Sequence, residues 1–343
     1  MAGMTYRLSV LDQSPIAEGS TATQALANTL DLARTCDRLG YDRYWLAEHH
    51  ASPALAGVSP EALIGPVAMA TQRIRVGSGG VMLPHYSPFK VAETFRMLAA
   101  LAPGRIDLGV GRAPGSDQRT AFALQRDRSR LMPHDFPQGL AELLGYLEHS
   151  LPQEHAFAML QDTLPTGGQG SPDVWLLGSS PDSAHWAAER GLPYCFADFI
   201  NSDGAGLARA YRQAFQPSAA CPAPRVMVAT WTIAAETSAE AERLAAPAKM
   251  MFAHLIAGNP IPVPSDEAAL AWLEANPHLA RRRNRRTVLG TPAEVRAGLD
   301  AVAAEYRADE LMLVNILPDH DARRRSYQLL AAEYGLAPAK EAA

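Results

Sequence analysis

The sequence predicts a (β/α)8 barrel, in which eight parallel strands alternate with helices and close into a ring. Short runs rich in strand-forming residues alternate with longer amphipathic runs along the chain. The 343 residues are 48% hydrophobic, so the chain can bury a large core. A doubly wound Rossmann-type sheet is the runner-up, because it would use fewer strands and leave the later units to a second domain. We therefore expect one domain over residues 1–343, with an insertion between the seventh and eighth strands.

The expected elements follow one another in a regular order. Strands are expected at residues 6–11, 43–47, 74–83, 105–110, 173–177, 192–197, 225–234 and 310–316. Helices are expected at residues 22–39, 60–71, 89–101, 181–190, 204–215, 237–255, 266–276 and 292–306, with one more at the C-terminus. Gly40 stands where the first helix should stop. The proline-rich stretch 258–264 is expected to form neither helix nor strand.

Composition excludes several classes of protein. The 36 acidic and 31 basic side chains leave a net charge of −5, which offers no general attraction for nucleic acid or anionic membranes. The first ten residues lack the pattern of a signal peptide, and no apolar run is long enough to span a bilayer. The three widely spaced cysteines fit neither a metal site nor a disulfide framework. We expect a cytoplasmic protein with reduced thiols.

Polar residues at the strand exits are the first candidates for chemistry, because barrel enzymes carry their active sites at the carboxyl ends of the strands. These candidates are the segments Glu48-His49-His50, Ser78-Gly79-Gly80, Gly111-Arg112 and Gly178-Ser179-Ser180. If the barrel prediction is right, segments far apart in the sequence meet around one opening.

Two of these segments are candidates for holding an anion. Glycines around Arg112 would let the backbone approach a ligand, and the guanidinium suits a phosphate. A tight turn with Arg112 in a surface ion pair explains the same pattern equally well. Ser180 followed by Pro181 is a typical helix start, so its hydroxyl can cap the helix. The free N–H groups there, with Ser183, can also hold a phosphate.

His49 and His50 raise three alternatives. A metal is the least favoured, because the sequence has no second cluster of ligands at suitable spacing. Either imidazole can serve as an acid–base group in a pocket, or both can be polar residues capping a strand end. A separate basic run, 281–286, is a solvated helix face or part of a mobile loop near the barrel opening.

Several motifs together resemble the bacterial luciferase-like monooxygenases. They are Leu46-Ala47-Glu48-His49-His50, Gly77-Ser78-Gly79-Gly80-Val81-Met82-Leu83-Pro84, Pro103-Gly104-Arg105-Ile106-Asp107-Leu108-Gly109 with Gly111-Arg112, and the segment 172–193. The similarity runs in order over nearly the whole chain and is clearest before residue 200. It is closer to an uncharacterised single-chain branch of the family than to either luciferase subunit.

The resemblance implies a flavin mononucleotide (FMN) site. Its phosphate would be held by Arg112 and Ser180, assisted by Ser183 and the backbone near Pro114, with Gly178 and Ser179 in the same loop. Ser78, Gly79 and Gly80 would lie against the flavin ring, where the family has a cis peptide bond not involving proline. Glu48 and His49 match the family's active-site carboxylate and imidazole, with His49 as the catalytic base or donor. The resemblance also favours a homodimer.

The implied reaction is two-component monooxygenation of a small organic substrate that the sequence does not name. A separate reductase would supply reduced FMN, and residues 257–286, within an insertion of about 257–290, would cover the site as a lid. Gly111 stands where the light-emitting subunit has a reactive cysteine, so light emission is not expected. The alternatives are a deazaflavin-dependent dehydrogenase and a flavin-binding barrel without catalysis.

Overall fold

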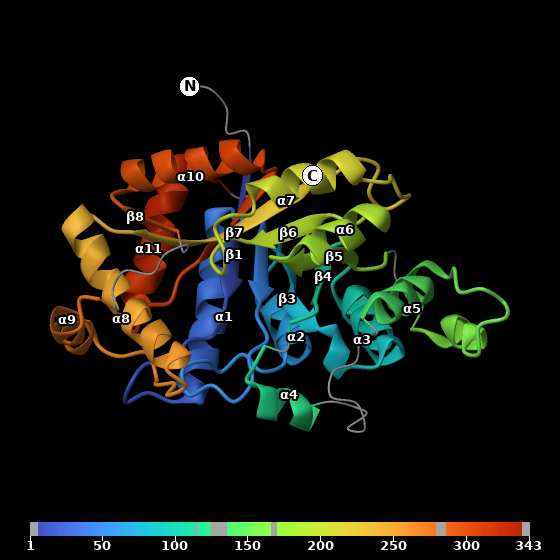
Figure 1. The fold of residues 1–343 in the computed structure, drawn as a ribbon, viewed down its shortest axis with the longest axis horizontal. Helices are drawn as coiled ribbons and strands as arrows, with labels where there is room; N and C mark the ends of the chain where they lie inside the picture. Colours follow the sequence, from blue (N-terminus) through green and yellow to red (C-terminus); the bar gives the residue numbers. More distant parts are fainter. Residues whose placement is uncertain (1–5, 114, 125–135, 166–169, 279–285, 338–343) are drawn as a thin grey trace.

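The protein is a closed barrel of eight parallel strands (Figure 1). The computed structural model describes residues 6–113, 115–124, 136–165, 170–278 and 286–337. The barrel strands are β1 (Arg7–Asp12), β2 (Arg43–Leu46), β3 (Arg75–Met82), β4 (Ile106–Gly111), β5 (Asp173–Gly178), β6 (Tyr194–Ala197), β7 (Val226–Ala234) and β9 (Glu310–Val314). They run in the order β6-β5-β4-β3-β2-β1-β9-β7, and parallel pairing of β6 with β7 closes the ring. The barrel prediction is confirmed, and the Rossmann-type alternative is wrong because no open edge remains between β6 and β7.

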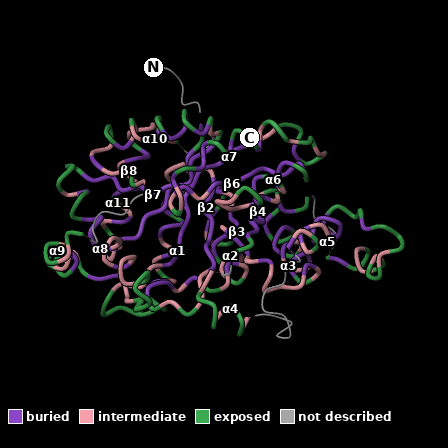
Figure 2. Tube along the Cα trace, viewed as in Figure 1, coloured by how far each residue is buried: buried purple, intermediate pink, exposed green. Residues whose placement is uncertain are grey.

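Helices surround the barrel and leave its strands in the buried centre (Figure 2). The α-helices are α1 (Ala22–Leu39), α2 (Pro60–Ala70), α3 (Pro88–Leu101), α4 (Gln118–Leu124), α5 (Phe136–Glu148), α6 (Pro181–Glu189), α7 (Ala205–Ala214), α8 (Ser238–Ile256), α9 (Asp266–Ala275), α10 (Pro292–Tyr306) and α11 (His320–Tyr334). Two short 3₁₀ helices are η1 (Leu83–His85) and η2 (Ala158–Thr163). None of the helices within the described ranges is long and apolar enough to cross a membrane.

Some local expectations are confirmed by hydrogen bonds at the ends of elements. The α1 helix begins where Thr21 accepts a bond from the Gln24 N–H, and it ends at Gly40, whose φ is 90°. This left-handed conformation favours glycine because it has no Cβ. Residues 258–264 form neither helix nor strand, apart from one bridge between Val263 and Ala17.

Other elements were not expected from the sequence. A ninth strand, β8 (Thr287–Gly290), pairs with the last part of β7, beyond the residues through which β7 pairs with β6. Four residues are too few to show a periodic pattern. No element was expected between residues 110 and 173, where α4, α5 and η2 form. Glycines at 139 and 145 lie inside α5 and weaken its helical signal.

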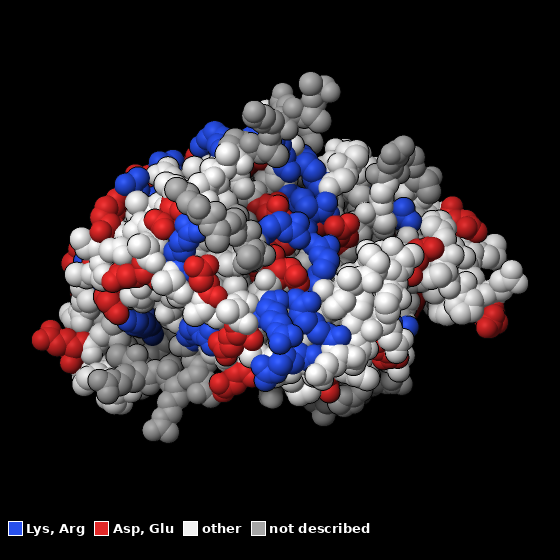
Figure 3. Space-filling model, turned by 90° about the horizontal axis from the view of Figure 1, so that it is seen from above, with Lys and Arg blue, Asp and Glu red and all other residues white. Residues whose placement is uncertain are grey.

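Charged side chains close the barrel at the amino ends of the strands. Arg43 lies inside and donates to Asp107 at 2.7 Å and to Glu310 at 3.0 Å. Arg75 adds a second ion pair with Asp107, so the buried charges are matched. On the face seen in Figure 3, basic side chains gather across the middle with acidic ones among them. Because this end is filled, a ligand reaches the interior from the carboxyl ends of the strands.

Candidate active site

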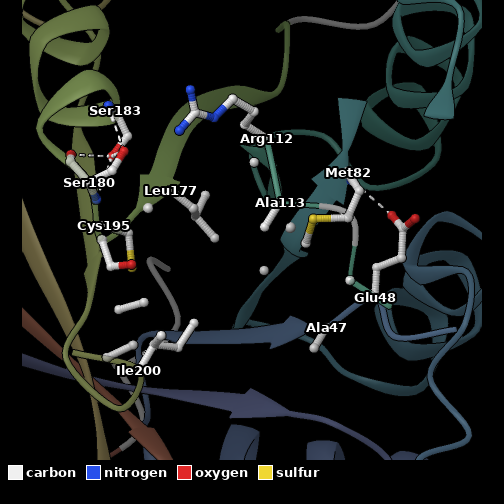
Figure 4. A pocket seen from close by; sticks show the side chains of 18 of the residues that line it. Ala47, Glu48, Met82, Arg112, Ala113, Leu177, Ser180, Ser183, Cys195 and Ile200 are labelled. Atoms are coloured by element: carbon white, nitrogen blue, oxygen red, sulfur yellow. Dashed lines mark hydrogen bonds between the residues drawn. The ribbon is translucent and has the colours of Figure 1, made fainter. Parts of the chain in front are cut away.

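A cavity of about 660 Å³ opens at the carboxyl ends of the barrel strands (Figure 4). All eight barrel strands supply part of its wall, either from residues within the strand or from the residues that follow it. These wall residues include Leu11, Gln13, Ala47, Glu48, His49, Gly79, Gly80, Met82, Gly111, Arg112, Leu177, Gly178, Ser179, Ser180, Ser183, Cys195, Ala197, Ala229 and Met312. The fold therefore brings most of the candidate residues of the sequence to one opening.

Arg112 and Ser180 line the same cavity, from the ends of β4 and β5. In Figure 4 the Arg112 guanidinium points towards Ser180 and Ser183. Its Nη1 donates to Asp182 Oδ2 at 3.0 Å, and its central carbon lies 5.2 Å from the ring centre of Trp186. The surface ion pair is thus confirmed, and the residue also lies at the cavity, where phosphate binding stays a prediction. The side chain is 48% exposed, so a ligand anion can reach it.

The serines at the start of α6 form a capping box. Ser180 Oγ accepts from the Ser183 N–H, and Ser183 Oγ accepts from the Ser180 N–H, both at 3.4 Å. Ser183 Oγ also bonds the Ser180 carbonyl at 2.8 Å and the Tyr194 hydroxyl at 3.0 Å. Gly178 is required here because a Cβ would collide with the Ser183 side chain. The capping interpretation is confirmed, and Ser183 is placed chiefly to hold the loop.

Glu48 is fully buried and hydrogen-bonded to three groups. Its Oε1 lies 2.8 Å from His50 Nε2, and its Oε2 accepts from the Met82 N–H at 2.9 Å. The Tyr86 hydroxyl is a further partner. Burial raises the pKa of Glu48, and these hydrogen bonds only partly oppose the shift. His50 is thus the partner of Glu48, whereas His49 faces elsewhere.

His49 is held by its backbone while its ring remains available. Its N–H donates to the Gly57 carbonyl at 2.8 Å. The ring lines the cavity, and its buried Nδ1 has no hydrogen-bond partner within the described part of the chain. Burial, with a smaller effect of His50, lowers the pKa of His49 to about 4. The imidazole is therefore neutral near pH 7 and can accept a proton or donate a hydrogen bond.

The end of β3 forms a flat, glycine-lined part of the wall. The peptide bond between Gly79 and Gly80 is cis, as the resemblance implies. A Cβ on Gly80 would lie 2.7 Å from the Gly109 carbonyl oxygen, so the backbones of β3 and β4 approach closely here. Ser78 does not line the cavity. Its buried hydroxyl donates to the Gly109 carbonyl at 2.8 Å and ties the same two strands together.

The remaining expectations concern Pro114, the basic run 281–286, the lid and a metal site. Pro114 and the arginines at 281–283 and 285 lie outside them. Arg286 is described and pairs with Glu305 at 2.7 Å. Within 257–278 and 286–290, no described residue lines the cavity, so the lid remains a prediction. The described residues also hold no group of three or more potential metal ligands.

Several cavity residues were not among the sequence candidates. Gln13 follows β1 directly, so the strand-exit rule that selected Glu48 would have found it. Met82 and Cys195 lie within strands, and only the register shows which strand residues point inwards. Phe136 and Trp186 come from helices, whose faces towards the opening are set by tertiary packing.

Fold and cavity together define an enzyme of the (β/α)8-barrel class, with its site where such enzymes carry it. Comparison with known proteins identifies the family. Residues 6–310 match the family model described as luciferase-like monooxygenase. A luciferase-like monooxygenase of Escherichia coli (strain K12) is 41% identical, with 96% of this chain and 97% of that protein covered. The N-acetyl-S-alkylcysteine monooxygenase of Bacillus subtilis (strain 168) is 37% identical over 95% and 97%.

A solved structure agrees with this assignment. The crystal structure of apo-MsnO8 has a TM-score of 0.88 and 40% sequence identity, covering 97% of this chain and 99% of that one. The chain therefore belongs to the luciferase-like monooxygenase family, and it is a flavin-dependent monooxygenase.

Proposed function

We propose that this protein oxidises a small organic substrate as the oxygenase component of a two-component, FMN-dependent system. The observation that supports this proposal best is that Arg112 and Ser180 share one cavity with Glu48 and His49. An anion-binding end and an acid–base end within one enclosure suit a cofactor that carries both a phosphate and a reactive ring. The monooxygenases of E. coli and B. subtilis match this chain over nearly their full lengths.

The residues present fit FMN. Arg112 offers a charged fork for the phosphate, and Ser179 and Ser180 add polar groups at the positive end of α6. Gly79 and Gly80 leave a wall without side chains, against which a flat ring can lie. At Gly115, a Cβ would lie 2.9 Å from the Glu48 carbonyl oxygen, so the loop after β4 also packs closely beside the cavity. The orphaned His49 Nδ1 is a buried polar atom that a bound group can satisfy.

When bound, reduced FMN supplies the reaction with molecular oxygen and the transfer of one oxygen atom to the substrate. The chain's own residues orient the ring, exclude water and manage protons. Neutral His49 is suited to hold or pass a proton beside the ring. Glu48 positions His50 and the Met82 backbone through its two oxygens.

The choice of FMN over a deazaflavin rests on the reaction. A deazaflavin transfers hydride and needs no oxygen, whereas relatives 41% and 37% identical to this chain carry the name monooxygenase. A separate reductase is inferred because the glycine run 109–115 does not match the dinucleotide-binding fingerprint.

The assembly and the compartment are also inferences. We infer a homodimer, since Met69, Met97 and Leu101 leave large apolar side chains exposed on α2 and α3. The three cysteines are buried and free, which suits a reducing cytoplasm. Analytical ultracentrifugation of the wild-type protein and of Met97→Glu tests the dimer. The wild type should sediment at twice the chain mass and the variant at the chain mass, and a monomeric wild type would contradict it.

The proposed function is tested by titration followed by an oxygen pulse. The purified protein is titrated with FMN, with reduced FMN under anaerobic conditions, and with a deazaflavin. The complex with reduced FMN is then mixed with oxygenated buffer in a stopped-flow spectrometer. We expect tighter binding of reduced FMN than of the deazaflavin. After mixing with oxygen, we expect a transient absorbance that decays more slowly in the protein complex than in a solution of reduced FMN alone. Preference for the deazaflavin would indicate the dehydrogenase, and FMN binding without a transient would indicate a non-catalytic barrel.

A further inference from the structure

One part of the cavity lies across the opening from the phosphate end. In a ring of eight strands, β1 stands four places from β5, and β9 four places from β4. Wall residues from β1 and β9 therefore lie across the opening from Arg112 and Ser180, and those from β7 and β6 continue the wall from there back to β5. In Figure 4, Ile200 and Ala47 lie at the opposite side of the cavity from Arg112. We call this part the inner chamber and define it by Leu11, Gln13, Cys195, Ile200, Ala229 and Met312.

The inner chamber is apolar and carries no charged side chain among its defining residues. One buried hydrophobic cluster inside the barrel contains Leu11, Cys195, Ala229 and Met312. Burial raises the pKa of the Cys195 thiol, so this group is neutral too. An ion placed here would lose its hydration without gaining a partner of opposite charge. The chamber therefore suits an uncharged group.

Gln13 is the exception to this apolar lining. Its side chain is 4% exposed, and its amide oxygen is buried with no hydrogen-bond partner in the described part of the chain. Unsatisfied buried polar groups are rare in folded proteins, and each destabilises the fold unless a ligand or water satisfies it. The residue follows β1 and lines the cavity, so a ligand in the chamber can meet its amide. Rotation of the amide plane presents either the oxygen or the NH2 group.

We propose that the inner chamber binds the part of the substrate that is oxidised beside the flavin, and that Gln13 selects for it. That part is uncharged and largely apolar, with one amide-type N–H group that donates a hydrogen bond to the amide oxygen of Gln13. Gln13 is thus a specificity-determining residue. This inference rests on the proposed function, because the flavin must occupy the side of Arg112 and Ser180 for the inner chamber to remain free.

The test uses the FMN-loaded protein and three probes of similar length. N-butylacetamide carries the amide, butylbenzene lacks it, and hexanoate carries a charge. Dissociation constants are measured by calorimetry for the wild type, Gln13→Met and Gln13→Leu. We expect both variants to bind N-butylacetamide about tenfold more weakly, as the loss of one hydrogen bond in a dry site implies. Butylbenzene binding should change by less than about twofold, and hexanoate should bind the wild type more weakly than the amide.

Met312→Leu is the matched control, because it alters the shape of the same chamber without touching a hydrogen bond. It should shift the affinities for N-butylacetamide and butylbenzene by the same factor. Equal losses for these two probes in the Gln13 variants would overturn the proposal, as would wild-type protein that does not bind the amide. Weaker FMN binding by Gln13→Met would place Gln13 against the flavin and also overturn it. Wild-type protein that fails to bind FMN would instead refute the proposed function, and the apo protein would then still test Gln13 with the same probes.

Discussion

Replacing Arg112 with alanine tests the anion-binding end of the cavity directly. FMN and riboflavin share the ring and differ in the phosphate, so a residue that holds the phosphate must distinguish them. We expect Arg112→Ala to weaken FMN binding and to leave riboflavin binding nearly unchanged. Dissociation constants for both ligands are measured by quenching of flavin fluorescence, at fixed pH and at two salt concentrations.

The magnitude follows from the surroundings of Arg112. A hydrogen bond to a charged group contributes about 1.5–3 kcal/mol. The side chain is 48% exposed and bonds Asp182 at 3.0 Å before any phosphate arrives. Solvent screens this charge, and the phosphate replaces the existing partner Asp182. The loss of binding free energy in Arg112→Ala should therefore lie at the lower end of that range. We therefore expect about a tenfold rise in the FMN Kd, and a smaller rise at high salt.

Asp182→Asn is the matched control because it removes the competing anion and keeps the size of the side chain. It should tighten FMN binding by about twofold to fivefold, since the phosphate no longer meets a carboxylate beside Arg112. The reasoning would be refuted by equal losses of FMN and riboflavin in Arg112→Ala. It would also be refuted by weaker FMN binding in Asp182→Asn.

Three further predictions concern buried groups. His49→Asn should lower the rate of substrate oxidation about 100-fold and change the FMN Kd by less than about twofold. Burial lowers the pKa of His49 to about 4, so a plot of the wild-type rate against pH should show no step from this group near neutral pH. Glu48→Gln should flatten the dependence of unfolding free energy on pH, measured with urea. Burial raises the pKa of Glu48, so its stabilising protonation is complete at low pH and is lost as the pH rises through the raised pKa. Asp12→Asn should destabilise the fold by about 3–5 kcal/mol near neutral pH, because it leaves buried Arg323 without its carboxylate at 2.8 Å. Burial opposes ionisation of Asp12, but the charge of Arg323 and the hydrogen bonds keep its pKa lowered, so this difference should shrink as the pH falls through the carboxyl range.

Each of these predictions has a result that contradicts it. A His49→Asn variant with the wild-type rate would remove the imidazole from the reaction. A Glu48→Gln variant whose stability falls with pH as steeply as the wild type would mean that Glu48 titrates normally. An Asp12→Asn variant as stable as the wild type at neutral pH would mean that the buried pair with Arg323 is replaceable.

The sequence predicted the strands of the barrel well and the connections less well. Each barrel strand overlaps its expected range, because buried parallel strands have strong apolar patterns of their own. The short strand β8 and the helices α4 and α5 were missed. Their patterns are short or interrupted by glycine, and they form because the barrel offers them a surface on which to pack.

The chemistry available at the site can be predicted from local patterns in the sequence. Glu48, His49, Arg112 and Ser180 were identifiable because strand exits, glycine runs and helix caps are local patterns. The partner of each side chain, in contrast, is set by the tertiary fold. It paired Glu48 with His50 rather than His49, turned Ser78 into the wall, and opposed Asp182 to Arg112. It also placed Gln13 across the cavity from the phosphate end. These contacts depend on how the ring of strands closes and on the register between its strands. Both are set by interactions between segments far apart in the sequence, so no local pattern predicts them.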